Sequence, residues 1–126
     1  MQDIKTMSPS TLAFMGDAVY GLLVREKLCS VNRPSGELHA MSVKYVSATA
    51  QDEAFSVISD LLSEEEMAVF KRGRNFHTSN TPKSSSAKQY HTATGLETLF
   101  GHLYLTGKND RLGELFDIIW NNKNQS

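Results

Sequence analysis

The segment SPSTLAFMGDAVYGLLVREKLC, residues 8–29, decides the fold class of this chain. Ser8 can accept hydrogen bonds from the first free amides of a helix, and Pro9 suits the first helical position. Apolar residues then recur at helical spacing, at Leu12, Met15, Val19, Leu22 and Leu23. The pattern predicts a helix from about Pro9 to Cys29.

The next segments continue the helical pattern. Residues 37–62 carry two apolar stripes, and a break near Ser47 would divide them into two shorter helices. Ser63-Glu64-Glu65-Glu66 is a capping box, in which Ser63 and Glu66 satisfy each other's backbone amides. It predicts a helix that runs to about Arg74.

The second half of the chain begins with a polar stretch and ends with two more helices. Residues 75–86 contain Thr81-Pro82 and three successive serines, which indicates a long loop. A helix is expected from about Ala87 to Thr106, where Gly107 is a suitable stop. Asn109 or Asp110 is expected to cap a last helix. Since no segment alternates like a strand, the predicted fold class is all-α.

Size and composition favour one small domain over residues 1–126. The chain has 126 residues, of which 40% are hydrophobic and 21% charged, as in ordinary globular proteins. There is no apolar run of membrane-spanning length and no signal peptide, so a cytoplasmic protein without a membrane partner is expected. Cys29 is the only cysteine, which excludes an internal disulfide, and it is expected in the core or at the surface.

A basic stretch lies within a chain of almost balanced charge. The net charge is −1, which by itself argues against a polyanionic partner. Residues 67–96, however, contain no Asp or Glu and five Lys or Arg, namely Lys71, Arg72, Arg74, Lys83 and Lys88. This distribution favours nucleic-acid binding, although basic residues at a helix end can also simply complement the helix dipole.

Two acids stand out from apolar helices. Asp17 and Glu97 are each surrounded by small and apolar residues, and a buried carboxylate needs a partner, a metal ion or a water-filled cleft. Gly16 and Gly101 lie beside them and favour a close approach of the two helices. The carboxylates could then share one hard cation. The alternative is a structural role, such as pairing with Arg25 or His102.

The other side chains give weaker signals. His39, His77, His91 and His102 lack the spacing of a zinc site. The large aromatic residues are expected in the core and not as platforms for base stacking; they are Phe14, Phe55, Phe70, Phe100, Phe116 and Trp120. Nothing indicates a Ser or Cys triad or a phosphate-binding Gly-rich loop.

Two motifs resemble those of the ribonuclease III catalytic-domain family. FMGDAV, residues 14–19, is similar to the family signature, and ETLFGHLYL, residues 97–105, resembles its second acidic motif. The short bacterial branch, Mini-ribonuclease III, which lacks a double-stranded-RNA-binding domain, is the closer resemblance. It is carried by Leu38-His39, Val46-Ser47-Ala48, Gln51, the stretch 65–75, and Thr81-Pro82-Lys83.

The chain departs from the larger members of this family at two positions. Ala13 stands four residues before Asp17, and Thr94 stands three residues before Glu97, where those members carry metal-binding acids. The resemblance therefore implies an active enzyme with weaker protein ligation of the metal and an open metal count.

The resemblance implies a homodimeric, Mg²⁺-dependent endoribonuclease that hydrolyses double-stranded RNA, with Mn²⁺ as a possible substitute. Asp17 and Glu97 would be the catalytic and metal-binding residues. The expected RNA contacts are Lys71, Arg72, Arg74, Asn75, Thr81, Lys83 and His39. Maturation of a 23S rRNA precursor in ribosome biogenesis, assisted by a ribosomal protein, is the implied task.

Two other functions remain open at this stage. The first is a catalytically silent module that binds RNA or the ribosome. The absence of acids at Ala13 and Thr94 supports this alternative. The second is a general helical interaction domain without any role in RNA binding. Retention of both Asp17 and Glu97 favours the enzyme.

Overall fold

The computed structural model describes residues 3–76 and 86–125, and most of this part is helical. The elements are the short 3₁₀ turns η1 (Ile4–Thr6) and η2 (Ser59–Leu61) and the helices α1 (Pro9–Leu28), α2 (Ser35–Val46), α3 (Ala48–Ile58), α4 (Glu64–Arg74), α5 (Ala87–Leu105) and α6 (Asn109–Lys123). No strand occurs within the described residues, which confirms the all-α class.

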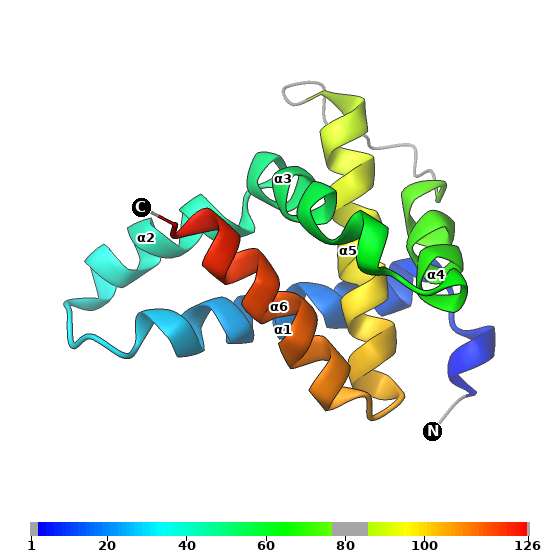
Figure 1. Cartoon of the computed structure of the whole chain (residues 1–126), viewed down its shortest axis with the longest axis horizontal. Coiled ribbons are helices and arrows are strands. Elements are labelled where there is room, and N and C mark those ends of the chain that lie inside the picture. Colours follow the sequence, from blue (N-terminus) through cyan, green and yellow to red (C-terminus); the bar gives the residue numbers. More distant parts are fainter. Residues whose placement is uncertain (1–2, 77–85, 126) are drawn as a thin grey trace.

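Helix α5 lies at the centre of the molecule, and α1 crosses it (Figure 1). It also packs against α3, α4 and α6. Its side chains Leu96, Leu99, Phe100 and Leu103 have no exposed surface. Burial of apolar area drives this arrangement, and α5 thereby becomes the element that fixes the other helices.

Glycines set the distance between α1 and α5. A Cβ atom on Gly16 would overlap the carbonyl oxygen of Glu97, and one on Gly101 would overlap the carbonyl oxygen of Leu12. Since only glycine lacks this atom, the two backbones can touch. The expected close approach at Gly16 and Gly101 is confirmed.

The local signals at the helix ends are mostly confirmed. The Ser8 hydroxyl accepts a hydrogen bond from the Thr11 amide at 3.1 Å, and the Ser63–Glu66 capping box is complete. Ser47 separates α2 from α3 and caps α3 by accepting from the Ala50 amide. Gly107 follows α5 with a φ of 76°, the left-handed conformation in which glycine is favoured.

The expected cap of the last helix is wrong. Helix α6 begins at Asn109 itself, so the residue before it is Lys108, which makes no side-chain cap. The connection after α5 is too short for a separate cap. Gly107 donates to the Tyr104 carbonyl and Lys108 to the Leu103 carbonyl, so the end of one helix passes directly into the next.

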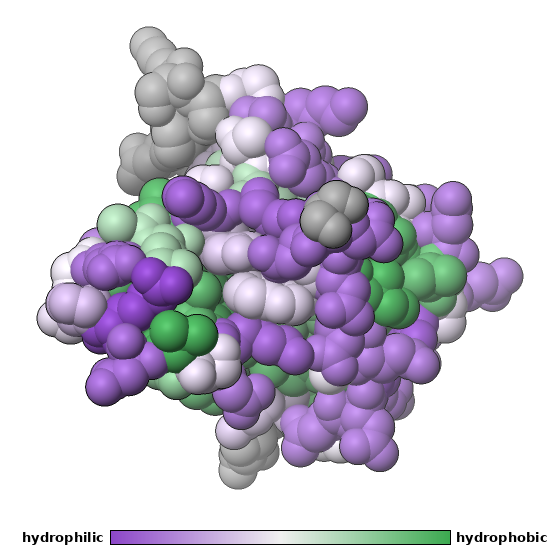
Figure 2. Space-filling model, turned by 60° about the vertical axis from the view of Figure 1, so that its left-hand side comes forward, coloured by the Kyte–Doolittle hydropathy of each residue, from purple (hydrophilic) through white to green (hydrophobic). Residues whose placement is uncertain are grey.

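Phe14 is not a core residue, contrary to expectation. Its side chain is 83% exposed, whereas Phe70, Phe100 and Phe116 are buried and Phe55 and Trp120 are half-buried. Phe14 lies two positions from both Leu12 and Gly16, about 200° around the helix, and so lies off the face of α1 that packs against α5. Figure 2 shows another face of the molecule, where apolar patches lie among mostly hydrophilic side chains.

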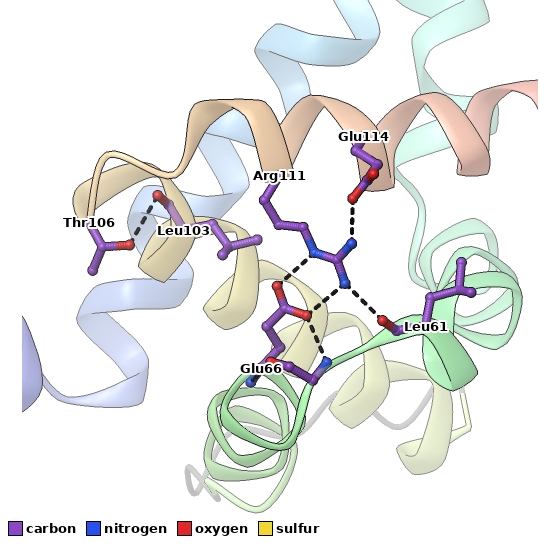
Figure 3. A network of polar contacts seen from close by, with 7 residues as sticks. Leu61, Glu66, Leu103, Thr106, Arg111 and Glu114 are labelled. Atoms are coloured by element: carbon purple, nitrogen blue, oxygen red, sulfur yellow. Dashed lines mark hydrogen bonds and ion pairs between the residues drawn. The ribbon is translucent and has the colours of Figure 1, made fainter.

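An ion-pair network joins α6 to α4 (Figure 3). Arg111 donates to both carboxylate oxygens of Glu66, at 2.8 and 2.9 Å, and to the carbonyl of Leu61. It also pairs with Glu114. Glu66 also belongs to the capping box of α4. One buried carboxylate therefore links the start of α4 to α6.

The surface features of the described residues are simple. Cys29 is exposed, in agreement with one of its two expected locations. Within residues 3–76 and 86–125, every helix is too short or too polar to cross a bilayer.

Candidate active site

Asp17 on α1 and Glu97 on α5 line the same cavity. Its volume is about 370 Å³, and its other lining residues are Ser10, Ala13, Phe14, Phe76, Tyr90 and Thr94. The close contact at Gly16 places the Glu97 backbone directly against α1, one residue from Asp17. The tertiary structure therefore brings together two acids that are eighty residues apart.

The two carboxylates differ in exposure. Glu97 is half-buried, whereas Asp17 is exposed. Asp17 follows Gly16 at the edge of the buried face of α1, where the side chain reaches the cavity and solvent. The pair thus lies at a surface that a large substrate can approach.

Glu97 holds its proton unusually tightly. Burial first, and then hydrogen bonding and repulsion by Asp17, raise the pKa of Glu97 from 4.5 to about 8, while a hydrogen bond from Gln51 opposes this rise. In its protonated form Glu97 donates to the Asp17 carboxylate. Two carboxylates this close cannot both ionise cheaply without a positive charge between them.

These residues fit a single hard cation. The described residues contain no cluster of three or more His, Cys, Asp or Glu side chains, so two carboxylates form the protein's acidic contribution. A divalent ion would displace the proton that the pair shares and relieve the repulsion. Mg²⁺ commonly keeps several waters and substrate phosphates beside one or two carboxylates, which matches this sparse site.

Ala13 and Thr94 border the same cavity, as their spacing from the two acids led us to expect. Ala13 offers no ligand atom, and the Thr94 hydroxyl donates to the Tyr90 carbonyl at 3.1 Å. The structure therefore places both replaced positions beside the acid pair. Neither adds a charge to it.

A second hollow lies on the other side of Asp17. It has a volume of about 420 Å³ and is lined by Asp17, Ala18, Gly21, Leu22, Arg25, His39, Ser42, Val43 and Val46. His39 on α2 thus lines the same hollow as Asp17. Arg25 shares the hollow but forms no ion pair with Asp17 among the described residues.

Comparison with known proteins places this geometry in a family. The profile of the Ribonuclease III domain matches residues 10–108. The Mini-ribonuclease 3 of Thermoanaerobacter sp. (strain X514) is 45% identical over 118 residues, which cover 93% of this chain and 83% of that protein. The Mini-ribonuclease 3 of Clostridium tetani is 40% identical over 122 residues, covering 95% and 81%.

A crystal structure of a protein from Fusobacterium nucleatum has the same fold. It superimposes with a TM-score of 0.87 at 29% sequence identity, and covers 97% of this chain and 94% of that one. The chain belongs to the Mini-ribonuclease 3 branch of the ribonuclease III family. Membership of this family confirms the expectation of an endoribonuclease.

The basic string of this chain, residues 71–75, does not form one surface. Arg72 turns toward the N-terminal segment and donates to the Met7 carbonyl at 3.2 Å. Arg74 lies over the Phe70 ring, 5.8 Å from its centroid, and donates to Asn75. Lys71 is exposed. The string is therefore divided between two sides of α4.

A third cavity, of about 620 Å³, lies between α3, α4 and α5 and receives Arg74 and Asn75 together with Lys88. Asp52 and Glu53 line its opposite side. Of the other residues expected to contact RNA, Thr81 and Lys83 lie outside the described residues. The structure thus groups Arg74, Asn75 and Lys88, and separates Arg72 from them.

Several residues that line the candidate site were not predicted from the sequence. Ser10, Phe76 and Tyr90 line the cavity of the acid pair, and Gln51 acts on Glu97. A helical signal was available for two of them. Ser10 precedes Asp17 by seven residues, and Tyr90 precedes Glu97 by seven, so each shares a helix face with its acid. Phe76 and Gln51 come from other elements and gave no such signal.

Proposed function

We propose that this chain is a Mg²⁺-dependent endoribonuclease that cleaves double-stranded RNA by phosphodiester hydrolysis, leaving 5′-phosphate and 3′-hydroxyl ends. The main support is the Asp17–Glu97 pair at an open cavity. The raised pKa of Glu97, about 8, means that its carboxyl group keeps its proton at neutral pH. A pair so arranged is prepared to exchange that proton for a divalent cation. Mn²⁺ would serve the same carboxylates.

The residues of the chain have separate tasks in this proposal. Asp17 and Glu97 would hold the cation, and the Glu97 carboxyl would release its proton to solvent when the cation binds. When bound, the cation activates water and neutralises charge that develops on the phosphate. Because Ala13 and Thr94 contribute no carboxylates, phosphate oxygens of the RNA would supply further ligands, and RNA and cation would strengthen each other's binding.

The proposal also requires a homodimer. Phe14, Leu22 and Val43 are 83%, 62% and 48% exposed, and all three line the two hollows beside Asp17. Large apolar side chains around a polar site support an interface with a second copy. Two sites facing opposite strands would let residues 1–126, acting as one catalytic domain, cut both strands of a duplex.

RNA contacts are proposed for the part of the basic string that lies away from the N-terminal segment. Arg74, Asn75 and Lys71, with Lys88 from α5, would bind phosphates, and His39 would lie near the cleaved strand. Thr81 and Lys83 belong to the same proposal. Duplex RNA is bound mainly through its backbone and shape, which suits a set of cations without an aromatic platform.

Cleavage of a duplex by the purified protein tests the function. With Mg²⁺ and a duplex of about two helical turns, the wild type should release 5′-phosphate ends, and Asp17→Asn should not. Asp60→Asn, which changes an exposed acid on η2, is the matched control and should cleave normally. Absence of cleavage by the wild type, with retained duplex binding, would favour the silent module instead.

The RNA contacts need a separate measurement. Arg74→Ala should weaken duplex binding and reduce the slope of its logarithmic salt dependence by about one. Arg72→Ala is the control from the same helix, since its guanidinium already binds the Met7 carbonyl. Equal losses in both variants would contradict the division of the string. Loss of selectivity for duplex RNA would instead favour a general interaction domain.

A 23S rRNA precursor is proposed as the natural substrate, with a ribosomal protein as an assisting partner. A transcript carrying the paired ends of that precursor should be cut at a few fixed positions, and addition of ribosomal proteins should raise the rate. Uniform cutting of any duplex at the same rate would contradict this assignment.

A further inference from the structure

No positive side chain among residues 3–76 and 86–125 lines the cavity of the acid pair. Besides Asp17 and Glu97, its lining consists of apolar residues and of the hydroxyl residues Ser10, Tyr90 and Thr94. Phosphate oxygens accept hydrogen bonds. Once a cation is bound between the acids, the hydroxyl groups are therefore the side-chain donors that the described walls offer to an RNA phosphate.

The three hydroxyl groups are not equally available. Thr94 donates to the carbonyl of Tyr90, one turn earlier on α5, at 3.1 Å, so its hydrogen is already used. Ser10 is exposed in the first turn of α1, where its hydroxyl can rotate freely. Tyr90 is the remaining donor, and its side chain is half-buried.

The ring of Tyr90 is packed, but its hydroxyl has no partner. The ring lies edge-on to the His91 ring, with 5.6 Å between the centroids, and it shares the cavity with Phe76. Within the described part of the chain, the Tyr90 hydroxyl makes no hydrogen bond. Tyrosine has few rotatable bonds, so fixing it against a ligand costs little entropy. The hydroxyl is thus available to a ligand in this cavity.

Tyr90 and Glu97 lie on one face of α5, two turns apart. Two turns correspond to about 10 Å along the helix axis, and Thr94 lies between them on the same cavity wall. Tyr90 is therefore too distant to be a further ligand of a cation held by the acids. A phosphate that follows or precedes the cleaved one along the strand is the group that its hydroxyl can meet.

We propose that Tyr90 binds the RNA backbone, with its hydroxyl donating to a non-bridging oxygen of a phosphate next to the one that is cleaved. The inference rests on the proposed function, which places the cleaved phosphate at Asp17 and Glu97. A neighbouring phosphate keeps its charge throughout the reaction. The hydrogen bond is therefore equally strong before and during the chemical step, and it contributes to RNA binding and not to kcat.

The test compares Tyr90→Phe with Tyr104→Phe, each of which removes one phenolic oxygen from α5. Tyr104 is 43% exposed and does not line the cavity, so it is the matched control. Duplex binding is measured with Ca²⁺, which like Mg²⁺ takes oxygen ligands. Steady-state cleavage is measured with Mg²⁺, and thermal unfolding is followed without RNA.

In Tyr90→Phe both Kd and KM for duplex RNA should rise by about tenfold, the size expected for a lost hydrogen bond to a charged group. The kcat should stay within about twofold of the wild type, and the melting temperature should not change, since the hydroxyl has no described partner in the protein. Tyr104→Phe should match the wild type throughout. An unchanged Kd, or a loss in kcat alone, would overturn the proposal.

Chemically modified RNA identifies the contact. In a set of duplexes, a methylphosphonate replaces the phosphates beside the cleaved linkage one at a time. One of these duplexes should bind Tyr90→Phe as tightly as it binds the wild type, because the accepting oxygen is already missing. An equal loss for Tyr90→Phe on every duplex would show that Tyr90 acts through the fold, and would overturn the proposal.

Failure of the proposed function can be distinguished from failure of this inference. If the wild type does not cleave duplex RNA, the enzyme proposal fails, but the binding measurements with Ca²⁺ still show whether Tyr90 contacts the backbone. If the wild type cleaves and Tyr90→Phe binds duplex RNA equally well, the inference alone fails.

Discussion

Glu66 and Glu97 are the same type of side chain in two regions of one small bundle, and their environments are opposite. Glu66, 8% exposed, accepts from Arg111 and from the Ser63 amide, and these hydrogen bonds, Arg111 first, hold the pKa of its carboxyl below the usual range. Burial and the nearby Asp17 raise the pKa of Glu97 to about 8.

The difference separates a region that holds the fold from one that is prepared for chemistry. The α4–α6 contact is electrically satisfied, so its charges stabilise the helices they join. The α1–α5 crossing carries an acid pair that the protein itself does not neutralise. A positively charged ligand would stabilise this acid pair, whereas a structural ion pair is neutralised by the protein's own side chains.

Glu97→Gln should give the largest effect on activity. Removing one of two ligating carboxylates should reduce duplex cleavage by roughly a thousandfold, and the melting temperature without metal should stay equal or rise because the repulsion from Asp17 is gone. Cleavage rates and thermal unfolding measure both. Glu114→Gln, an exposed acid of the other region, should cleave normally; a similar loss there would remove the contrast.

Gly16→Ala should lower the free energy of unfolding by about 3 kcal/mol. The added Cβ would overlap the carbonyl oxygen of Glu97, so the two helices must separate and the acids move apart. Gly113→Ala on α6 meets no atom within 4 Å and should instead stabilise by about 0.5–1 kcal/mol. Urea unfolding gives both values, and equal signs would contradict the close contact.

Arg111→Ala should lower the free energy of unfolding by about 2 kcal/mol. It leaves the nearly buried Glu66 carboxylate without its main partner, while the specific activity of the folded protein should be retained. Glu114→Gln removes the exposed member of the network and should cost less than about 0.5 kcal/mol. A loss of activity at full folding in Arg111→Ala would show that the two regions are coupled.

The two glutamates should change the stability of the fold in opposite directions as the pH is varied. The stabilisation from Glu66, whose pKa is lowered, is present above pH 4.5 and is lost as the pH falls through its folded value. The pKa of Glu97 is raised, so its contribution is present below pH 4.5 and is lost as the pH rises toward about 8.

Urea unfolding of the metal-free protein between about pH 3 and 9 tests this contrast. Glu66→Gln should abolish the acid loss, and Glu97→Gln should abolish the loss above pH 4.5. Addition of Mg²⁺ should counter only the second loss, since a bound cation stabilises the folded state. A stability that is independent of pH in both variants and in the wild type would refute the comparison.

The sequence by itself determined the helices and the family. Ser8, Ser47, the Ser63–Glu66 box and Gly107 act on backbone groups within a few residues, so their effects can be read locally. The motifs around Asp17 and Glu97 indicated a ribonuclease III domain, and Gly16 and Gly101 predicted where the helices touch. The cap predicted at Asn109 or Asp110 is wrong, because Gly107 and Lys108 bond back to α5 and α6 begins directly at Asn109.

Only the tertiary structure decided which side chains share an environment. It exposed Phe14 and Asp17, divided Arg72 from Arg74, and joined Arg111 to Glu66 across forty-five residues. It also packed α3, which carries Gln51, against α5, which carries Glu97. Burial and electrostatic interaction depend on which helix faces cross, and that depends on the packing of all the helices around α5, which no local pattern contains.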